Sequence, residues 1–303
     1  GEKYDGLDYV ESAINSGSVA VVAETENPNS DHAVPWVKVP NGREAMSVMS
    51  DIFNNSPSEE LTIIGVTGTN GKTTTSYMIH RLLDLGHRRS GLIGTIKYDL
   101  KSDNEIEATR TTPEAIDLQN YLSQMISNGC CSAVMEVSSH ALSQSRTSHV
   151  YYDVGVFTNL SHDHLDYHGN MDRYFNAKKI LFDQLSNNEV KNKAVAVINS
   201  DDDWGRKLVH YLSNKKVKTV TYGLANGADY RAVDLRLTKT SIEFAIEVGS
   251  RKFKSSIPLV GRFNIYNALA ALASCAAVGL NVRETVNNLK QLPQIPGRLE
   301  SVS

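Results

Sequence analysis

The sequence predicts an α/β fold built on a central, mostly parallel β-sheet with a phosphate-binding loop, preceded by a small α/β N-terminal domain. From residue 61 onward, short runs of apolar and β-branched residues alternate with helix-length segments, a pattern typical of parallel sheets covered by helices. The stretch VTGTNGKTTT, residues 66–75, lies between the first such run and the first helix. At 303 residues, the chain is long enough for two domains rather than one.

The first 58 residues are predicted to be a partial N-terminal domain. Helices are expected at 9–14 and 43–53, and strands at 19–23 and 37–39. The polar stretch NNSPSEE, residues 54–60, contains Pro57 and is predicted to be a linker. Because this piece is short for an independent domain, we expect sequence to precede it.

The second domain is predicted at 59–297, followed by a hinge at 298–303. Its strands are expected at 61–66, 91–96, 132–137, 153–158, 194–198 and 217–222. Its helices are expected at 72–86, 114–128, 172–186, 203–213 and 263–278. Residues 230–257 alternate apolar and polar side chains and predict an antiparallel hairpin, 241–248 with 252–257. Ligands of parallel sheets bind beyond the carboxyl ends of the strands, so functional residues are expected in the loops that follow strands.

The glycine-rich loop at 66–75 has the layout of a phosphate-binding site. Gly68 and Gly71 allow backbone N–H groups to turn toward phosphates, and the following helix adds a partial positive charge. Lys72 is placed to reach the outer phosphates, and the Thr73 hydroxyl to bind magnesium. The loop departs from the general pattern at Val66, where a glycine is usual. The alternative is a plain glycine-rich turn.

Composition excludes several classes of function. The net charge of −3 gives no electrostatic reason to expect nucleic acid or an anionic membrane as a partner. No apolar run is long enough to span a bilayer, and the three cysteines form no disulfide or zinc pattern. We therefore expect a cytoplasmic protein in a reducing compartment.

Two further stretches follow predicted strands and carry side chains suited to chemistry. Glu136 ends a predicted strand in MEVSSHAL and is interpreted as a magnesium ligand rather than a solvated charge. The loop FTNLSHDHLDYHG follows the next strand and holds five His and Asp residues, of which at most one histidine is expected to touch magnesium. Zinc is the alternative there, but the spacing fits no common zinc pattern.

Lys178, in the helical stretch RYFNAKKILF, has two interpretations. It belongs either to a solvated helix face or, with Tyr174 and Leu181, to an inward face. An inward lysine near a divalent cation would be repelled unless it were neutral or modified. The stretch 110–113, Arg-Thr-Thr-Pro, predicts a helix start with a threonine N-cap and Pro113 as the first helical residue.

Together these stretches resemble the Mur ligase family, most closely the members that add a diamino acid to UDP-N-acetylmuramoyl-L-alanyl-D-glutamate. The resemblance runs through the whole chain, from DGLDYVESAINSGSVAVVAE to PLVGRFNIYNALAALA and PGRLE. It implies an ATP-dependent amide ligase of peptidoglycan synthesis that acts through an acyl phosphate. It also implies a monomer whose amino-acid-binding domain would lie beyond the residues given, so that this chain alone is expected to ligate weakly or not at all.

The resemblance implies a role for each matching position. It assigns ATP and metal binding and catalysis to the residues of the phosphate loop, two predicted magnesium ligands, a lysine carbamylated by carbon dioxide, and three residues near the nucleoside. These are Gly68, Thr69, Asn70, Gly71, Lys72, Thr73, Thr74, Glu136, His164, Lys178, Asn264, Asn267 and Arg298. Thr73, Glu136, His164 and carbamylated Lys178 would hold magnesium. The residues implied to bind the UDP-muramoyl dipeptide are Thr111, Thr112, Ser138, Gln144 and Arg146.

Two departures and two alternatives accompany this resemblance. Arg110 stands where many members have asparagine or a small residue, and the early Asp-Ser-Arg motif for the uridine is absent. A folylpolyglutamate synthase or another Mur synthetase is one alternative, and a non-enzymatic scaffold related to the family is the other. The sequence does not distinguish L-lysine from meso-diaminopimelate as the amino acid added.

Overall fold

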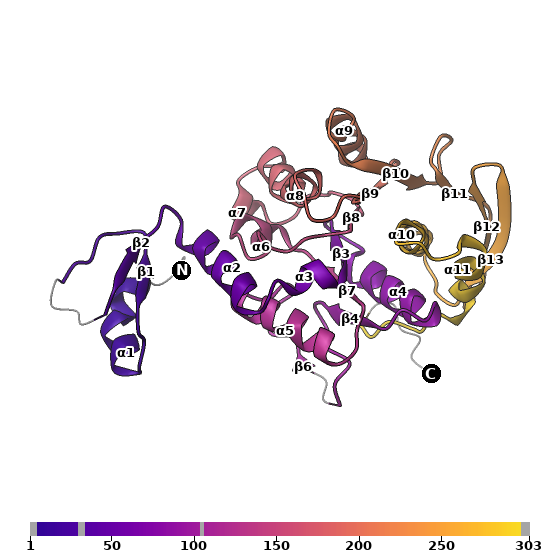
Figure 1. The fold of residues 1–303 in the computed structure, drawn as a ribbon. Coiled ribbons are helices and arrows are strands. Elements are labelled where there is room, and N and C mark those ends of the chain that lie inside the picture. The colour runs from indigo at the N-terminus through magenta and orange to yellow at the C-terminus, as the bar shows by residue number, and fades with distance from the viewer. Residues whose placement is uncertain (1–4, 30–33, 104–105, 298–303) are drawn as a thin grey trace.

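The computed structural model describes residues 5–29, 34–103 and 106–297, and the account below concerns those residues. Figure 1 shows a main body organised around one sheet, with a small N-terminal part to one side. The sheet has 11 strands in the order β13-β12-β11-β10-β9-β8-β3-β7-β4-β5-β6. The predicted α/β fold with a mostly parallel sheet is therefore confirmed.

The parallel centre of the sheet contains all six strands predicted after residue 60, with small shifts at their ends. These strands are β4 (Ser90–Ile93), β7 (Ser132–Glu136), β3 (Thr62–Thr67), β8 (Val154–Phe157), β9 (Val195–Asn199) and β10 (Lys218–Gly223). Val66 pairs with Glu136, and Thr67 pairs with Phe157. Since the strands run in one direction, the segments that follow β3, β7 and β8 meet at one edge of the sheet.

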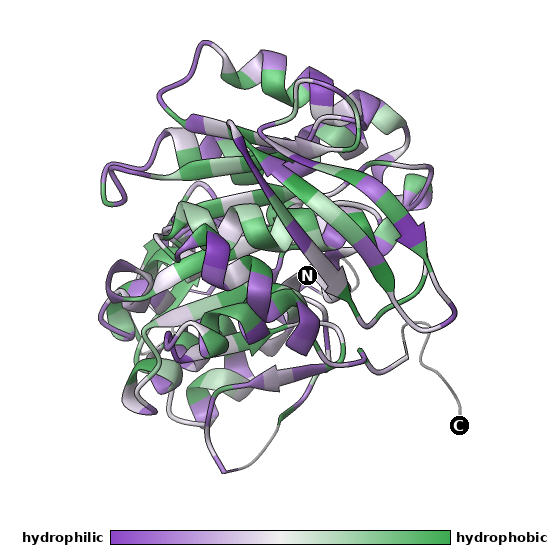
Figure 2. Cartoon of the chain, turned by 90° about the vertical axis from the view of Figure 1, so that its right-hand side faces the viewer, coloured by the Kyte–Doolittle hydropathy of each residue, from purple (hydrophilic) through white to green (hydrophobic). Residues whose placement is uncertain are grey.

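Both ends of the sheet turn antiparallel. The predicted hairpin is present as β12 (Ile242–Val248) and β13 (Arg251–Ile257), and β11 (Tyr230–Leu237), which was not predicted separately, joins it to β10. Figure 2 looks onto this side and shows hydrophilic and hydrophobic segments alternating along the strands, as expected when one face is buried. At the other end lie β5 (Lys97–Asp99) and β6 (Ile106–Glu107).

Helices cover both faces and complete two apolar cores. One core is built from α4 (Lys72–Leu85), α10 (Phe263–Ala277) and the unpredicted α11 (Val282–Asn288) with its 3-10 turn η2 (Leu289–Gln291). The other is built from α5 (Ala115–Ser127), α8 (Met171–Ser186) and α9 (Asp203–Leu212). Two short helices, α6 (Ser139–Ser143) and α7 (Leu165–His168), follow β7 and β8. No helix in the described part of the chain is both long and apolar enough to cross a membrane.

The N-terminal part forms the predicted small α/β unit. It contains η1 (Gly6–Tyr9), α1 (Val10–Asn15), β1 (Val21–Ala23), β2 (Trp36–Lys38) and α2 (Gly42–Phe53). The two strands pair in parallel as a separate sheet. The predicted linker is only partly irregular, because Pro57 begins a short helix, α3 (Pro57–Glu60). Proline is favourable as a first helical residue, since its missing N–H would have no partner there.

The predicted helix start at residues 110–113 is wrong. Helix α5 begins at Ala115, its N-cap is Glu114, and no side chain caps it. The Thr112 hydroxyl instead donates to the backbone oxygen of Glu136, 2.9 Å away, and accepts from the N–H of Ser138. This long-range bond fastens the segment before α5 to the end of β7, which a local helix-cap rule does not anticipate.

Candidate active site

A cavity of about 660 Å³ opens at the carboxyl ends of β3, β7 and β4. It is lined by residues of the phosphate loop and the start of α4, the loop after β4, the segment before α5, the end of β7, the start of α10, and the last described residue. These are Thr69, Asn70, Gly71, Lys72, Thr73, Thr74, Thr95, Thr111, Glu136, Phe263, Asn267 and Gly297. The parallel strands thus bring the predicted loops to one place.

The phosphate loop is held in a shape that requires glycine. Gly68 and Gly71 have φ values of +144° and +86°, in the region that side chains rarely adopt. A Cβ atom on Gly68 would lie 1.9 Å from the Thr158 hydroxyl oxygen, and one on Gly71 would lie 2.6 Å from Asn267 Oδ1. The Lys72 amino group donates to the carbonyls of Gly68 and Thr69, at 3.0 and 2.9 Å.

The loop is fastened from outside by two residues that sequence reasoning did not single out. The Asn70 N–H donates to Asn159 Oδ1, and the Thr158 hydroxyl and the Asn159 amide both donate to the Asn70 carbonyl. Both residues lie in the stretch FTNLSHDHLDYHG, directly after β8. The signal that could have found them is their position, since polar residues just after a buried parallel strand lie at the ligand-binding edge.

Glu136 is completely buried at the end of β7, and its carboxylate accepts three hydrogen bonds. The Thr73 hydroxyl donates to Oε2 at 3.0 Å. Thr95 donates twice, from its N–H to Oε1 at 2.8 Å and from its hydroxyl to Oε2 at 3.1 Å. A buried carboxylate needs such partners to offset the loss of hydration. The structure therefore joins two predicted metal-binding residues, Thr73 and Glu136, through a direct contact.

Lys178 points inward, as the second interpretation of its helix predicted. Its side chain is 1% exposed, and its amino group donates to the Gly68 carbonyl at 2.9 Å. The amino group also lies 4.5 Å from the centre of the Tyr174 ring. Burial, followed by repulsion from Lys72, holds the pKa of Lys178 well below its usual value, against a smaller opposing effect of Asp163. A lowered pKa favours the neutral, nucleophilic form of the amine.

The predicted histidine cluster divides into an exposed and a buried part. The His164 side chain is 47% exposed, pairs with Asp163, and meets the rings of His140 and Tyr174 edge-on. His168 is buried, shares a hydrogen bond with the Ser139 hydroxyl at 2.9 Å, and stacks on Tyr174. Burial, and then the charge of His140, lowers the pKa of His168 to about 4. His168 is thus a neutral packing partner behind Tyr174 and Lys178.

The five residues predicted to bind the dipeptide form one connected group. The Thr112 hydroxyl lies 3.3 Å from that of Ser138, and the Thr112 carbonyl accepts from the Arg146 guanidinium. Arg146 also donates to Gln144 Oε1. Thr111 reaches the cavity itself, and its hydroxyl lies 3.1 Å from that of Thr95. The group is therefore continuous with the edge of the cavity.

The residues predicted to lie near the nucleoside are placed differently from one another. Asn267 lines both the main cavity and an adjoining recess of about 250 Å³, and its Oδ1 accepts from the Thr75 hydroxyl. Asn264 is buried beneath it, accepts from the Asn267 amide, and donates to the Val260 carbonyl. Asn264 thus supports Asn267. The third residue, Arg298, lies outside the described residues.

The residues at this cavity suit a triphosphate with magnesium. The glycine turns leave space where a Cβ would clash, α4 begins at the loop, and Lys72 supplies a positive charge. A threonine hydroxyl and a buried carboxylate in contact are hard oxygen donors, the type that magnesium prefers. In the described residues, no three His, Cys, Asp or Glu side chains are grouped as a metal site. A metal here would accordingly draw ligands from the Thr73 hydroxyl, the Glu136 carboxylate and phosphate oxygens.

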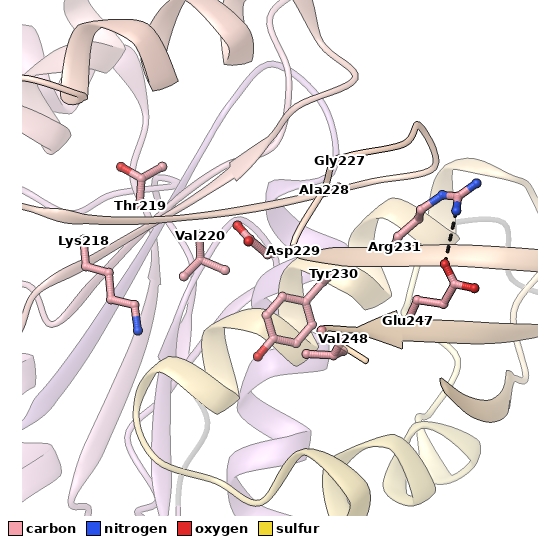
Figure 3. Close-up of a pocket in the computed structure, with 11 residues that line it drawn as sticks. Lys218, Thr219, Val220, Gly227, Ala228, Asp229, Tyr230, Arg231, Glu247 and Val248 are labelled. Carbon is pink, nitrogen blue, oxygen red and sulfur yellow. Dashed lines mark hydrogen bonds and ion pairs between the residues drawn. The ribbon is translucent and has the colours of Figure 1, made fainter. Parts of the chain in front are cut away.

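A second cavity, of about 520 Å³, lies beside β10, β11 and β12 (Figure 3). Its wall includes Lys218, where β10 begins, so it lies away from the carboxyl ends of the parallel strands. Arg231 and Glu247, neighbours on its wall, form an ion pair at 3.1 Å, and both side chains are about one-third exposed, at 31% and 35%. None of the residues predicted from the sequence to form the site lines this cavity.

Comparisons with known proteins identify a family for most of the chain. The Mur ligase middle domain family matches residues 66–275. A UDP-N-acetylmuramoyl-L-alanyl-D-glutamate–2,6-diaminopimelate ligase of Geobacillus thermodenitrificans is 41% identical over 299 residues, 98% of this chain and 60% of the relative. The ligase of the same name from Listeria monocytogenes (serotype 4b, strain F2365) is 37% identical over 303 residues, again 60% of the relative.

A solved structure shares the fold across the same region. The structure, also of a UDP-N-acetylmuramoyl-L-alanyl-D-glutamate–2,6-diaminopimelate ligase, superposes with a TM-score of 0.85 at 31% identity. The match covers 98% of this chain and 59% of that one. The chain thus spans about 60% of the length of the curated relatives it matches.

Proposed function

The chain belongs to the Mur ligase family, and we propose that it acts as an ATP-dependent ligase that adds a diamino acid to UDP-N-acetylmuramoyl-L-alanyl-D-glutamate in peptidoglycan synthesis. The observation that supports this most directly is the buried Glu136 carboxylate, which two threonines hold beside a phosphate loop. The names of the relatives favour 2,6-diaminopimelate over lysine as the amino acid.

The proposed reaction has two steps. A carboxylate oxygen of the D-glutamate side chain attacks the γ-phosphorus of ATP, the bond to the β,γ-bridging oxygen breaks, and ADP leaves with that electron pair. The products are ADP and an acyl phosphate. The amino group of the diamino acid then attacks the acyl carbon, inorganic phosphate leaves, and the amine loses a proton as the amide forms.

The residues around the cavity have distinct tasks in the first step. Lys72, now bonded to two loop carbonyls, would turn to the outer phosphates and offset negative charge on the transferring group. Thr73 and Glu136 would hold magnesium, which when bound supplies further positive charge to the phosphates. Asn70 and Gly71 lie on the loop that would enclose the phosphates, and Asn267 borders the adjoining recess, which would hold the base.

Lys178 is proposed to carry a carbamate. The neutral form of this buried amine attacks carbon dioxide and releases one proton, which leaves a negatively charged carbamate. A carbon-13 NMR experiment with labelled bicarbonate tests this step. A carbamate resonance is expected from the wild type and from Lys179→Ala, whose lysine faces the Tyr211 ring, but not from Lys178→Ala. A signal that survives in Lys178→Ala would contradict the assignment.

The group around Thr112 is proposed to bind the dipeptide. Arg146 is buried. Its guanidinium pairs with Glu114 and donates hydrogen bonds to Gln144 and to the Thr112 carbonyl, so its position is fixed before a ligand binds. Thr111 marks the point where this group meets the phosphate loop. The D-glutamate carboxylate would therefore lie between Thr111 and the γ-phosphate.

The nucleotide site is tested by comparing two lysines. Binding of a non-hydrolysable ATP analogue with magnesium is measured by titration calorimetry, with Lys72→Ala and Lys218→Ala side by side. Loss of a charge-assisted bond costs about 1.5–3 kcal/mol, so Lys72→Ala is expected to bind about 10- to 100-fold more weakly. Lys218→Ala, in the second cavity, is expected to bind as the wild type does. Equal affinities in the two variants would contradict the proposed site.

The competing functions are separated by a second ligand. UDP-N-acetylmuramoyl dipeptide is expected to bind the chain, and Arg146→Ala is expected to weaken that binding. A folylpolyglutamate synthase would bind nucleotide but not this ligand. A scaffold that had lost the activity would bind neither.

A further inference from the structure

Thr95 lies at the junction of the two halves of the cavity. It follows β4, and its N–H and its hydroxyl both donate to the Glu136 carboxylate, one to each oxygen, at 2.8 and 3.1 Å. The same hydroxyl lies 3.1 Å from that of Thr111. Gly94 permits this close approach, because a Cβ there would lie 2.5 Å from Glu136 Oε1. Thr95 thus touches both the predicted metal side and the predicted substrate side.

The direction of these hydrogen bonds follows from counting protons. A hydroxyl carries one hydrogen and two lone pairs, and a carboxylate can only accept. Since Thr95 gives its hydrogen to Glu136, the hydrogen between the two threonines must come from Thr111. A directed chain therefore runs from Thr111 through Thr95 to Glu136, where the Thr73 hydroxyl also donates.

We propose that Thr95 is a positioning residue that fixes the Glu136 carboxylate and couples it to Thr111, so that the nucleotide and the acceptor carboxylate are bound cooperatively. This inference rests on the proposed ligase function. Thr95 acts through Glu136 and Thr111. When the Thr73 hydroxyl turns to the metal, Thr95 remains as the side-chain donor that orients Oε2. The contribution of Thr95 is therefore largest in the magnesium-loaded state.

The chain contains a matched control in Thr221, beside the second cavity. Its N–H and hydroxyl both donate to one carboxylate, Asp229 Oδ2, each at 2.8 Å. The chemistry is the same as at Thr95, but Asp229 lies on the wall of the cavity in Figure 3, and the bonds are exposed to solvent. Replacing either threonine by valine removes a hydroxyl-to-carboxylate bond and keeps the shape of the side chain.

The experiment measures binding of a non-hydrolysable ATP analogue by calorimetry, with and without magnesium, to the 303-residue chain. Thr95→Val is expected to weaken binding about 10-fold in magnesium and less than about 2-fold without it, as for loss of a bond to a charged group. Thr221→Val is expected to bind as the wild type in both conditions. Thr95→Ser, which keeps the hydroxyl, is expected to restore most of the magnesium-dependent affinity.

The coupling between Thr95 and Thr111 is measured by introducing Thr111→Val into the wild type and into Thr95→Val. In the wild type, this change is expected to weaken magnesium-dependent nucleotide binding about 2- to 3-fold, because Thr95 loses its donor. In Thr95→Val, the same change is expected to have no further effect, since the chain of bonds is already broken. If Thr95→Val does not fold, the Thr111→Val and Thr95→Ser measurements decide the question.

Three results would overturn the inference. These are equal behaviour of Thr95→Val and Thr221→Val, an equal loss of affinity with and without magnesium, and additive effects of the Thr95 and Thr111 changes. Failure of the proposed function is distinguishable from these, because the wild type itself would then not bind the analogue in magnesium. That result would remove the basis of both proposals.

Discussion

The cavity at the phosphate loop and the cavity beside β10, β11 and β12 are similar in volume, about 660 and 520 Å³, but differ in what surrounds them. At the first, Glu136 is fully buried and Lys178, bonded to the phosphate loop, is 1% exposed. At the second, Arg231 and Glu247 remain 31% and 35% exposed. Removing a charge from water costs free energy that must be offset by partners. Burial of ionisable side chains, rather than volume, therefore distinguishes the candidate active site.

The different positions of the cavities in the sheet explain this contrast. Parallel strands bring the loops after β3, β4, β7 and β8 to one edge, where helix α4 also begins. The second cavity lies where β10 and β11 share only a short parallel pairing, from Tyr222 with Tyr230 to Gly223 with Arg231. Loops from several strands can enclose and preorganise polar groups, whereas a gap between two strands leaves them in water.

The largest difference between the two regions is expected from a pair of glycine substitutions. Gly68 and Gly227 both have positive φ, but a Cβ would clash at Gly68 and meets nothing within 4 Å at Gly227. Gly227→Ala is expected to lose about 1–2 kcal/mol of unfolding free energy from backbone strain alone. Gly68→Ala adds overpacking against Thr158 and is expected to lose about 2–5 kcal/mol. Urea unfolding measures both, and equal losses would mean that the phosphate loop is not rigidly packed.

Much of the first cavity was predictable from the sequence because its residues sit in local motifs. Lys72 and Thr73 follow a glycine-rich turn, and Glu136 ends an apolar run, so strand-loop-helix reasoning finds them. Thr95 and Asn159 were not found, because their roles depend on contacts with segments distant in the sequence. Thr95 contacts Glu136, and Asn159 contacts Asn70. Nothing in the short stretches around them identifies those partners.

The start of α5 shows that local sequence rules can also predict a feature that the structure does not contain. The stretch 110–113 satisfies the local rules for a helix start, yet Thr112 donates to the end of β7 and the helix begins at Ala115. A local preference worth about 1 kcal/mol gave way to bonds that fasten a loop at the cavity. Local rules therefore fail where distant segments meet, which is where the candidate site lies.

A smaller effect is expected from the pH dependence of the unfolding free energy, through the buried His168 of the first region. The pKa of His168 is lowered to about 4 by burial and neighbouring charges, whereas an unfolded histidine titrates near 6.5. Between these values the unfolded chain binds the extra proton, so stability is fully present above about pH 6.5 and is lost toward pH 4. At about 1.4 kcal/mol per pKa unit, the loss is expected to be about 1–3 kcal/mol.

The variant that tests this is His168→Phe, which keeps an aromatic ring against Tyr174 and removes the titrating group. Urea unfolding of the wild type and the variant is compared from pH 4 to 7. The variant is expected to lose less stability than the wild type as the pH falls. If the unfolding free energies of the wild type and the variant change in parallel with pH, His168 is not the group responsible for the loss of stability.

The smallest effect is expected at the second cavity, from the ion pair between Arg231 and Glu247. The residues are direct neighbours on β11 and β12, but water screens their charges, and Lys252 also lies 3.6 Å from Glu247. A double-mutant cycle with Arg231→Ala and Glu247→Ala, followed by urea unfolding, is expected to give a coupling of about 0.2–1 kcal/mol. Neither change should alter binding of the ATP analogue. A coupling above about 2 kcal/mol would exceed what a solvent-screened ion pair can supply. A loss of nucleotide affinity would show that the second cavity takes part in binding, contrary to what its exposed residues indicate.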